Sequence, residues 1–394
     1  MKKYLVGFVK YSRFVYAVYF YCGSALLRVL RWFVRPDDRL LLFVSYGGKK
    51  FDDSPKAVYR ALIEDPRFAG FRIVWAFNRP EAFDIPIGEK IRTDTLKYFT
   101  TALKARCWIT NSSVERGLSF IGKHTFQVNT WHGSPIKKMG GDIARQNNSF
   151  KSKSTVVPDV FLAQSRFDAD IFSRVFAIPK NRFRIIGLPR NDELANTPAD
   201  RIASFRCELG IPEGKQAILY APTFREYDQT KAKECTLALP VDFGKWKREL
   251  GDRYVLLLRA HYEVAHAMGA IDGEFVRDVS GFPDLNKLML ASDLLVSDYS
   301  SIFFDYSILN KPMLCFAYDY DKYAEQRGVY FDIREELSAG RILTTENDVI
   351  AELKNFDRAG YIRKTAAFRE KYVTEYGRSS QRTVAIITEN LGLR

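Results

Sequence analysis

Short apolar runs alternate with longer amphipathic stretches along the chain from Asp37 onward. Turn-forming or helix-capping residues flank each run, which is typical of strands in α/β units with parallel sheets. The pattern therefore predicts an α/β fold. In the first half of the chain the expected strands are Leu40–Ser45, Arg72–Phe77, Cys107–Thr110, Thr125–Thr130 and Val157–Ala163. In the second half they are Ala217–Ala221, Tyr254–Arg259, Leu294–Ser297 and Met313–Phe316.

A polar stretch with a proline, Glu193–Asp200, lies between the two sets of strands and predicts an interdomain linker. We therefore expect two doubly wound, Rossmann-like domains, at residues 37–195 and 196–394. Ligands of such sheets bind beyond the carboxyl ends of the strands, so the substrate is expected in a cleft that the two domains face. The last segment, Ala359–Arg394, predicts one or two helices that could pack back across the first domain.

Residues 1–36 precede this pattern and are basic and aromatic. They hold seven Lys or Arg residues and no Asp or Glu. The longest uncharged run, Phe14 to Leu27, is shorter than the ~20 residues that a bilayer-spanning helix needs. No small-residue cleavage site follows it, which argues against a signal peptide. We expect a basic amphipathic helix lying on an anionic membrane surface, with an ordinary buried helix and a true anchor as alternatives.

The composition is that of a soluble globular protein, since 46% of the 394 residues are hydrophobic and 27% are charged. The formal net charge of +13 implies a partner of opposite sign: nucleic acid, an anionic bilayer or a phosphate-rich substrate. No helix-turn-helix, zinc or RNA-recognition pattern is present, so we expect no nucleic-acid partner. Five widely spaced cysteines without a CxxC pair predict neither disulfides nor a zinc site and fit a reducing cytoplasm.

The segment NTWHGSPIKKMG, residues 129–140, directly follows an apolar strand. It places His132 before a glycine, a hydroxyl residue and a proline, which leaves backbone N–H groups near an imidazole. That combination suits a phosphate oxygen or a nucleophilic hydroxyl, and Lys137 and Lys138 add positive charge. Taken alone, His132 could equally be a hydrogen-bonded core histidine at a turn.

Four further segments place polar residues at predicted strand ends or turns. GLPRND offers Arg190, whose rigid fork of donors matches phosphate, APTFRE offers Thr223, and LRAH offers Arg259 and a second histidine. In DLLVSDYSSIFFD, Ser300 and Ser301 occupy a strand-to-helix turn, where N–H groups and the helix dipole favour phosphate. Taken singly, Arg190 could form a surface salt bridge and the serines could be plain N-caps.

In this order, NTWHGSPIKKMG, GLPRND, ILYAPTFRE, LRAH and SDYSSIFFDYSILNKPMLCFAYD resemble the successive signatures of the CDP-glycerol glycerophosphotransferases, the primases and polymerases of wall teichoic acid and related capsules. YGGKKFDDSPKAVY and RGVYFD match the same family more weakly. The resemblance runs from about Leu40 to about Asp332 and implies a glycosyltransferase-B-like fold. It also implies a peripheral enzyme on the cytoplasmic face of the cell membrane.

By this resemblance His132 falls where the family has a catalytic histidine that activates the acceptor hydroxyl, and His261 is expected to share in catalysis. Besides His132, the positions that match the family's CDP-glycerol contacts are Gly133, Ser134, Pro135, Ile136, Arg190, Pro222, Thr223, Arg259, Ala260, His261, Ser300, Ser301 and Asp305. The sequence departs from the family pattern twice. Ser134 replaces the usual Thr and keeps the hydroxyl, whereas AHYE replaces the more common MHP around His261.

The implied reaction is an in-line phosphoryl transfer, in which an acceptor hydroxyl attacks the glycerol-bearing phosphorus of CDP-glycerol and CMP leaves. The expected acceptor is lipid-linked or polymeric, anionic and part of the cell envelope. No metal and no other cofactor is expected, because Asp37–Asp38 and Asp52–Asp53 lack a supporting ligand set. The alternatives are a glycosyltransferase-B enzyme that uses CDP-ribitol or a UDP-sugar, and a non-catalytic polyanion-binding scaffold. No oligomeric state is predicted.

Overall fold

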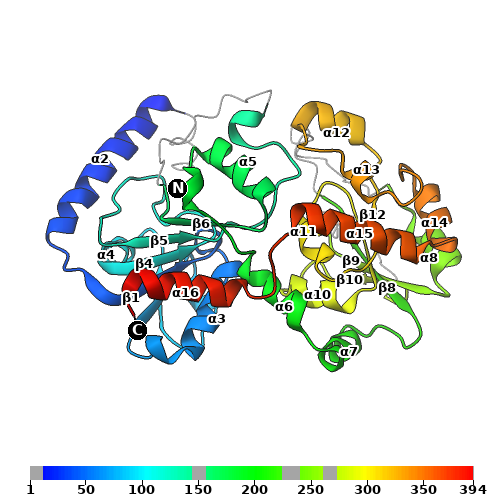
Figure 1. Cartoon of the computed structure of the whole chain (residues 1–394), viewed down its shortest axis with the longest axis horizontal. Coiled ribbons are helices and arrows are strands. Elements are labelled where there is room, and N and C mark those ends of the chain that lie inside the picture. The colour runs from blue at the N-terminus through cyan, green and yellow to red at the C-terminus, as the bar shows by residue number, and fades with distance from the viewer. Residues whose placement is uncertain (1–11, 144–156, 224–239, 261–272, 394) are drawn as a thin grey trace. The chain divides into compact units, whose positions relative to one another are not determined.

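The structure, a computed structural model, describes residues 12–143, 157–223, 240–260 and 273–393. It divides into two structural units, each built around one parallel sheet (Figure 1). The first unit comprises the described residues of Met1–His132, Arg145–Asp192 and Glu375–Arg394. The second comprises those of Gly133–Ala144 and Glu193–Thr374.

The first unit holds a sheet of seven parallel strands in the order β3-β2-β1-β4-β5-β6-β7. The strands are β1 (Asp37–Val44), β2 (Arg72–Phe77), β3 (Glu89–Arg92), β4 (Ala105–Thr110), β5 (Phe126–Asn129), β6 (Val160–Ala163) and β7 (Phe183–Ile185). From β1 the chain adds strands first in one direction and then, from β4, in the other. The junction of β1 and β4 is thus the topological switch point, where doubly wound sheets bind their ligands.

Two layers of helices cover this sheet. They are α2 (Arg13–Trp32), α3 (Asp53–Glu64), α4 (Leu96–Lys104), α5 (Arg166–Phe176) and α16 (Ser379–Leu391). Leu41 and Phe43 of β1 share a buried cluster with residues of α3 and α16, whereas Leu40 and Leu42 share one with residues of α2 and α4. Successive side chains of β1 therefore point to opposite faces, and both faces of the sheet are buried.

The second unit holds a sheet of five parallel strands in the order β10-β9-β8-β11-β12. The strands are β8 (Gln216–Ala221), β9 (Tyr254–Leu258), β10 (Val276–Asp278), β11 (Leu294–Ser297) and β12 (Met313–Cys315). Here the switch point is the junction of β8 and β11. The helices are α6 (Asp192–Asn196, of which Asp192 belongs to the first unit), α7 (Ala199–Glu208), α8 (Phe243–Leu250), α10 (Leu285–Ala291), α11 (Ile302–Ser307), α12 (Tyr320–Arg327), α13 (Ile333–Leu337), α14 (Glu346–Lys354) and α15 (Arg358–Tyr372).

The predicted α/β class, with two doubly wound parallel sheets and an N-terminal helix, is confirmed. All nine predicted strands are present within a few residues of their expected ends. The strands β3, β7 and β10 have no counterpart among the predicted ones, and each lies at the edge of its sheet. Glu193–Asp200, predicted as a linker, is largely helical and contributes to α6 and the start of α7.

Candidate active site

Three loops of the first unit follow the carboxyl ends of β1, β4 and β5 and carry the polar residues Tyr46, Asn111 and His132. The first two loops flank the switch point of the seven-stranded sheet. Tyr46 N donates to the Asn111 side-chain oxygen at 2.7 Å, which joins the two loops. His132 follows the next strand in the sheet, so its imidazole enters the same region from β5.

The backbone around His132 is held in a tight turn. Trp131 has a left-handed backbone conformation with φ of 51°, and its N–H donates to the Asn129 side-chain oxygen at 2.9 Å. The Trp131 indole stacks on the imidazole, with ring centroids 4.1 Å apart, and the Tyr46 ring lies 5.7 Å away. Aromatic contacts therefore fix the plane of the half-buried imidazole.

One hydrogen bond assigns the tautomer of His132. The Nδ1 atom lies 2.7 Å from the carbonyl oxygen of Asn111. A carbonyl oxygen only accepts, so Nδ1 must carry the proton and Nε2 is the basic nitrogen of the neutral ring. Burial lowers the pKa of His132, although the Asn111 carbonyl and Asp53 act in the opposite direction. The neutral imidazole thus prevails near pH 7, as a general base requires.

Arg190, from the GLPRND segment, reaches this loop. Its guanidinium donates to the His132 carbonyl oxygen at 2.8 Å and forms an ion pair with Asp53 at 3.1 Å. Both side chains are largely buried, with 14% of Arg190 and 2% of Asp53 exposed. The structure therefore brings two predicted site residues, His132 and Arg190, into direct contact. The Arg190 guanidinium donates to both carboxylate oxygens of Asp53 and to the carbonyl oxygen of His132, and so helps to hold the His132 backbone in place.

Asp53 is the centre of this network. The Tyr46 hydroxyl and the Asn111 side-chain amide both donate to its carboxylate, the latter at 3.1 Å, and Ser54 N donates at 2.6 Å. Burial alone would raise the pKa of Asp53, but the Arg190 guanidinium and these hydrogen bonds together hold it below its ordinary value. Asp53 is therefore a buried carboxylate that stays charged.

The sequence motifs did not single out Asp53, Tyr46 or Asn111 as functional residues. Tyr46 and Asp53 fall within YGGKKFDDSPKAVY, which matched the family only weakly. A signal was present for Tyr46 and Asn111, because each directly follows a predicted strand. Asp53 lies further along, at the start of α3, and in the structure it has a positive φ of 66°, which is uncommon outside glycine, asparagine and aspartate.

A second group of predicted residues lies at the switch point of the five-stranded sheet. Thr223, just beyond β8, donates its N–H to the Asp298 carboxylate at 2.9 Å, and Asp298 follows β11. Tyr299 N also donates to Asp298 at 2.7 Å, and Asp298 is 2% exposed. Pro222 precedes Thr223, and both are half-buried. Asp298 therefore joins the two loops of this switch point, as Asn111 does in the first unit.

The predicted serines, Ser300 and Ser301, lie immediately before α11. Ser300 Oγ accepts from Ile302 N at 3.3 Å, and Ser301 is the N-cap residue of the helix. Asp305 is buried within α11 at 5% exposure. Ser301 makes no side-chain capping hydrogen bond, and Ser300 lies one residue before the N-cap. The structure therefore does not bear out plain N-capping by either serine side chain.

Arg259 and Ala260 follow β9. The Arg259 guanidinium donates to the carbonyl oxygens of Val279, at 2.8 Å, and Phe282. Ala260 N donates to Ser280 Oγ at 3.0 Å. Arg259 thus ties the end of β9 to the turn after β10. His261 lies outside the described residues.

The loop Gly133–Ile136 belongs to the second unit, although it follows His132 directly. Ser134, Pro135 and Ile136 are buried, and the Ile136 carbonyl accepts from Tyr330 N at 2.9 Å. Two residues further on, Lys138 N donates to the Gly328 carbonyl at 3.0 Å. The segment from Ile136 to Lys138 therefore pairs with RGVYFD, residues 327–332, the other segment that resembles the family.

No cluster of three or more His, Cys, Asp or Glu side chains that could hold a metal ion occurs among residues 12–143, 157–223, 240–260 and 273–393. Asp53 and Asp298 are each engaged by hydrogen bonds from the protein.

The chain matches known proteins over nearly its whole length. Residues 26–389 match the family model described as CDP-glycerol:poly(glycerophosphate) glycerophosphotransferase. A teichoic acid glycerol-phosphate transferase of Staphylococcus aureus is 32% identical over 368 residues, which cover 88% of this chain and 92% of that protein. A teichoic acid poly(glycerol phosphate) polymerase of Staphylococcus epidermidis is 33% identical over 361 residues, but the chain spans only 49% of that longer protein.

Solved structures of the wall teichoic acid polymerase TagF have the same fold. One matches with a TM-score of 0.83 and 31% identity, and the match covers 94% of each chain. A histidine-to-asparagine variant of TagF soaked with CDPG matches with a TM-score of 0.84 at 30% identity, over 94% of this chain and 93% of that one. The order of the motifs, the two doubly wound sheets and the matched length agree, and the chain belongs to the CDP-glycerol:poly(glycerophosphate) glycerophosphotransferase family.

Proposed function

We propose that this protein transfers glycerol phosphate from CDP-glycerol to a hydroxyl of a teichoic acid acceptor, lipid-linked or polymeric, and releases CMP. Family membership and the likeness to TagF support the donor and the acceptor class. The observation that carries the proposal is the state of His132, whose Nδ1 proton is held by the Asn111 carbonyl and whose depressed pKa keeps the ring neutral. That is the state of a general base.

In the proposed step, His132 Nε2 takes the proton of the acceptor hydroxyl as its oxygen attacks the glycerol-bearing phosphorus. A new phosphorus–oxygen bond forms, the bond to the CMP oxygen breaks, and the electron pair leaves with CMP. Such transfers depend mainly on positioning and on neutralising phosphate charge. Asp53 contributes as a positioning residue by holding Arg190, and Arg190 fixes the His132 backbone in addition to its proposed contact with the donor.

The donor is proposed to bind at the positions that match the family's contacts. These are His132, Gly133, Ser134, Pro135, Ile136, Arg190, Pro222, Thr223, Arg259, Ala260, His261, Ser300, Ser301 and Asp305. Asp298 supports this assignment, because it holds Thr223 and the start of the Ser300–Ser301 turn at one switch point. The proposal requires that His132 and these residues act on the same donor molecule.

The test is CMP release from CDP-glycerol by the purified full chain with a lipid-linked acceptor. The variant His132→Asn should lose about 10²–10⁴ of the rate, the usual contribution of a general base. His124→Asn is the matched control, since His124 precedes β5 and therefore lies at the opposite edge of the sheet. Near-normal turnover by His132→Asn would contradict the assignment, and faster turnover of CDP-ribitol or a UDP-sugar would overturn the donor.

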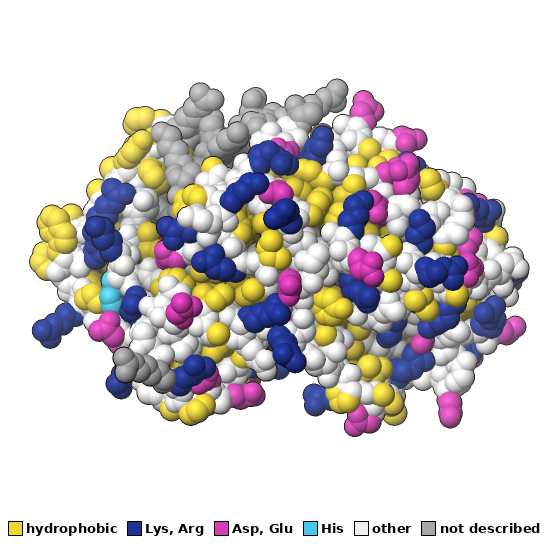
Figure 2. All heavy atoms as spheres, in the orientation of Figure 1, with side chains coloured by type: hydrophobic (Ala, Val, Ile, Leu, Met, Phe, Trp, Pro, Cys, Tyr) yellow, Lys and Arg dark blue, Asp and Glu magenta, His cyan; other side chains and the backbone are white. Residues whose placement is uncertain are grey.

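We further propose that the enzyme works at the cytoplasmic membrane surface through α2. One face of α2 packs on the loop after β4, where the Tyr19 hydroxyl donates to the Arg116 carbonyl at 2.8 Å. Arg28 Nε donates to the Ser119 carbonyl at 3.1 Å, and Leu27 is buried. The other face bears exposed hydrophobic side chains, which Figure 2 shows along the outer edge of the helix: Phe14, Val18, Tyr21, Leu26, Val29 and Trp32.

The described part of α2 from Phe14 to Trp32 is long and apolar enough to cross a membrane. A spanning position would, however, remove Tyr19, Arg28 and Leu27 from their partners and leave polar groups unpaired in hydrocarbon. Lying in the interface keeps those contacts and buries only the apolar face. The peripheral position is therefore the better supported of the two.

A further inference from the structure

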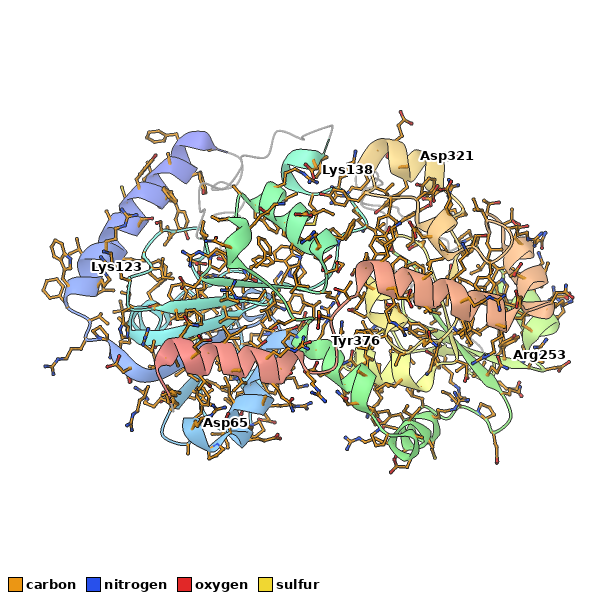
Figure 3. All side chains as sticks on the ribbon, in the orientation of Figure 1. Asp65, Lys123, Lys138, Arg253, Asp321 and Tyr376 are labelled. Carbon is orange, nitrogen blue, oxygen red and sulfur yellow. The ribbon has the colours of Figure 1, made fainter. Side chains whose placement is uncertain are left out.

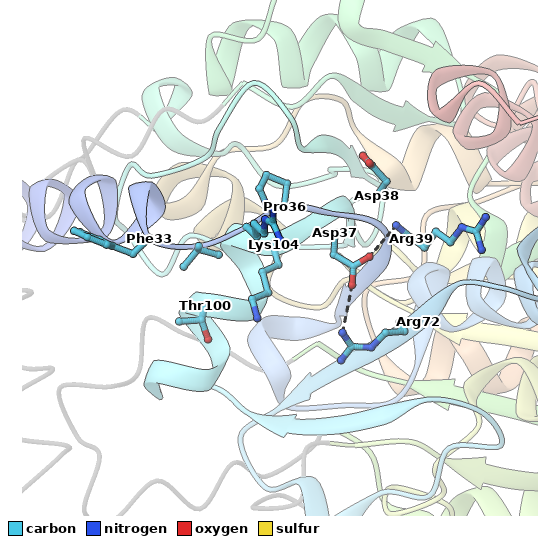
Figure 4. Close-up of a pocket in the computed structure, with 10 residues that line it drawn as sticks. Phe33, Pro36, Asp37, Asp38, Arg39, Arg72, Thr100 and Lys104 are labelled. Atoms are coloured by element: carbon cyan, nitrogen blue, oxygen red, sulfur yellow. Dashed lines mark hydrogen bonds and ion pairs between the residues drawn. The ribbon is translucent and has the colours of Figure 1, made fainter.

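A pocket of about 740 Å³ opens at the amino edge of the seven-stranded sheet, next to the end of α2 (Figure 4). Its walls are the connection from Phe33 to Pro36, the first three residues of β1, the first residue of β2, Arg72, and the end of α4 with Thr100 and Lys104. His132 lies beyond the carboxyl edge of the same sheet. The seven residue steps of β1 alone separate the two edges by roughly 23 Å, so the pocket is distinct from the candidate active site.

The side chains that line the pocket are more often cationic than anionic. Four cationic side chains, Arg35, Arg39, Arg72 and Lys104, line it together with two carboxylates, Asp37 and Asp38. The C-termini of α2 and α4 add about half a negative charge each, and Glu89 pairs with Arg72, so the formal charges around the pocket nearly balance. Binding of an anion therefore depends on individual cations that have no partner.

The cations differ in how far they are already neutralised. Arg72 forms ion pairs with Asp37, at 3.3 Å, and with Glu89, at 2.8 Å, and Figure 4 shows the first of these. In the described parts of the chain, the Arg35, Arg39 and Lys104 side chains have no hydrogen-bond or ion-pair partner. Three charges are therefore available to a ligand without breaking any existing pair.

The position of the pocket indicates where its ligand comes from. Phe33 lines the pocket and continues the exposed face of α2, with Trp32 and Phe33 exposed at 78% and 80%. Figure 3 shows side chains of α2 projecting away from the sheet along the helix. Aromatic residues of this kind settle at the headgroup level of a bilayer, and neighbouring Lys and Arg side chains reach lipid phosphates there.

We propose that this pocket binds the phosphate group of an anionic membrane lipid at the surface on which α2 lies. Three free cations, an opening at the aromatic end of the amphipathic helix and a volume that admits a headgroup together favour a lipid phosphate. The inference rests on the proposed peripheral position of α2 and adds a specific headgroup site to it. It concerns a surface remote from His132, so it is independent of the catalytic assignment.

The test compares binding of the full chain to vesicles of phosphatidylcholine alone and with a fifth of phosphatidylglycerol. The pocket variant is Arg35→Gln/Arg39→Gln/Lys104→Gln. The matched control, Arg60→Gln/Arg79→Gln/Arg363→Gln, removes the same charge from exposed side chains elsewhere. We expect the wild-type chain and the control to bind anionic vesicles at least tenfold more tightly than neutral ones. The pocket variant should keep its binding to neutral vesicles and lose most of this preference.

An equal loss of preference in the control would mean that only the overall charge matters, and would overturn the pocket. An unchanged preference in the pocket variant would do the same. The third arm is inorganic phosphate at constant ionic strength. The ligand is a soluble anion, and the lipid proposal fails, if two results occur together. Phosphate then raises the melting temperature of the wild-type chain but not of the pocket variant, and the wild-type chain binds anionic and neutral vesicles equally well. If the wild-type chain binds no vesicles at all, the membrane position of α2 fails instead. The rate of CMP release tests the transferase assignment separately, so its failure can be distinguished from failure of the pocket or of the membrane position of α2.

Discussion

Among single residues, Asp53 connects the stability of the fold to the position of the proposed base, His132. A buried ion pair is a modest net contributor to folding when intact, but its disruption is costly because the remaining charge stays buried. Arg190, the partner of Asp53, also holds the His132 carbonyl. The same change should therefore weaken the fold and displace the base.

The variant Asp53→Asn tests this coupling. Asparagine tolerates the positive φ of 66°, so the change removes charge with little backbone strain. We expect a loss of about 3 kcal/mol in the free energy of unfolding, measured with urea, and a clear fall in CMP release. The exposed pair of Glu274 with Lys247 is the control, and Glu274→Gln should change neither quantity appreciably. Unaltered activity in a destabilised Asp53→Asn would separate the two roles.

The proposed role of His132 as the base predicts how the reaction depends on pH. The base acts when neutral, so kcat/KM should fall as pH drops through the pKa of His132. Burial lowers that pKa, so the acid limb is expected below the ordinary histidine value of about 6.5. Asp53 raises the pKa of His132, and the limb should move further to acid in Asp53→Asn. A limb above 6.5, or a shift to alkaline pH in the variant, would contradict this arrangement.

The sequence predicted some of these residues and not others, for a physical reason. His132 and Arg190 stand in local motifs, where residue type and neighbours carry the signal. The role of Asp53, by contrast, depends on contacts between loops that are distant in the sequence, and the same holds for Tyr46 and Asn111. Tyr46 and Asn111, for example, are 65 residues apart. In the sequence, Asp52–Asp53 cannot be distinguished from two acidic residues at the start of any helix. Only the fold shows that Arg190 lies beside Asp53.

At the scale of elements, the position of a strand in its sheet decided whether it could be predicted. Central strands such as β1 and β8 are buried on both faces and appear in the sequence as continuous apolar runs. The edge strands β3, with sequence EKIR, and β7, with FRI, are short and largely exposed. Edge strands commonly carry charges that prevent pairing with other chains, and this removes the hydrophobic pattern.

The packing of α16 on the first unit depends on Gly187. Gly187 has a φ of 86° and lies close to the chain at Glu375 and Ser379. A Cβ added to it would meet Ser379 Oγ and lie 2.5 Å from the Glu375 carbonyl oxygen. Gly187→Ala should therefore lower the free energy of unfolding by about 2–3 kcal/mol, from strain and steric overlap together. Gly214→Ala is the control, with φ of 79° and open space around it, and should cost only about 1 kcal/mol. Equal urea midpoints for the two variants would mean that steric overlap at Gly187 contributes nothing.

In each of the two units, residues of the predicted motifs lie at the carboxyl ends of the strands beside the switch point of the sheet. Each sheet changes direction once, between β1 and β4 or between β8 and β11, and buried polar residues join the two loops there: Asn111 in one unit and Asp298 in the other. Strand ends could be read from the sequence. The order of the strands, and with it the location of each switch point, could not, because it depends on long-range pairing.

The membrane position of α2 can be separated from the stability of the fold. Tyr21→Asp/Val29→Asp places two charges on the exposed apolar face, at side chains that are 57% and 44% exposed. Binding to neutral vesicles should weaken at least tenfold, because lipid contact loses apolar area and gains charge, while the urea midpoint stays close to that of the wild type. Ile87→Asp/Leu96→Asp makes the same change at exposed hydrophobic side chains outside α2 and should leave vesicle binding intact. Equal loss in both variants would indicate a nonspecific charge effect. Loss confined to α2 would assign the bilayer contact to this helix and set the orientation in which the pocket at its end meets lipid phosphate.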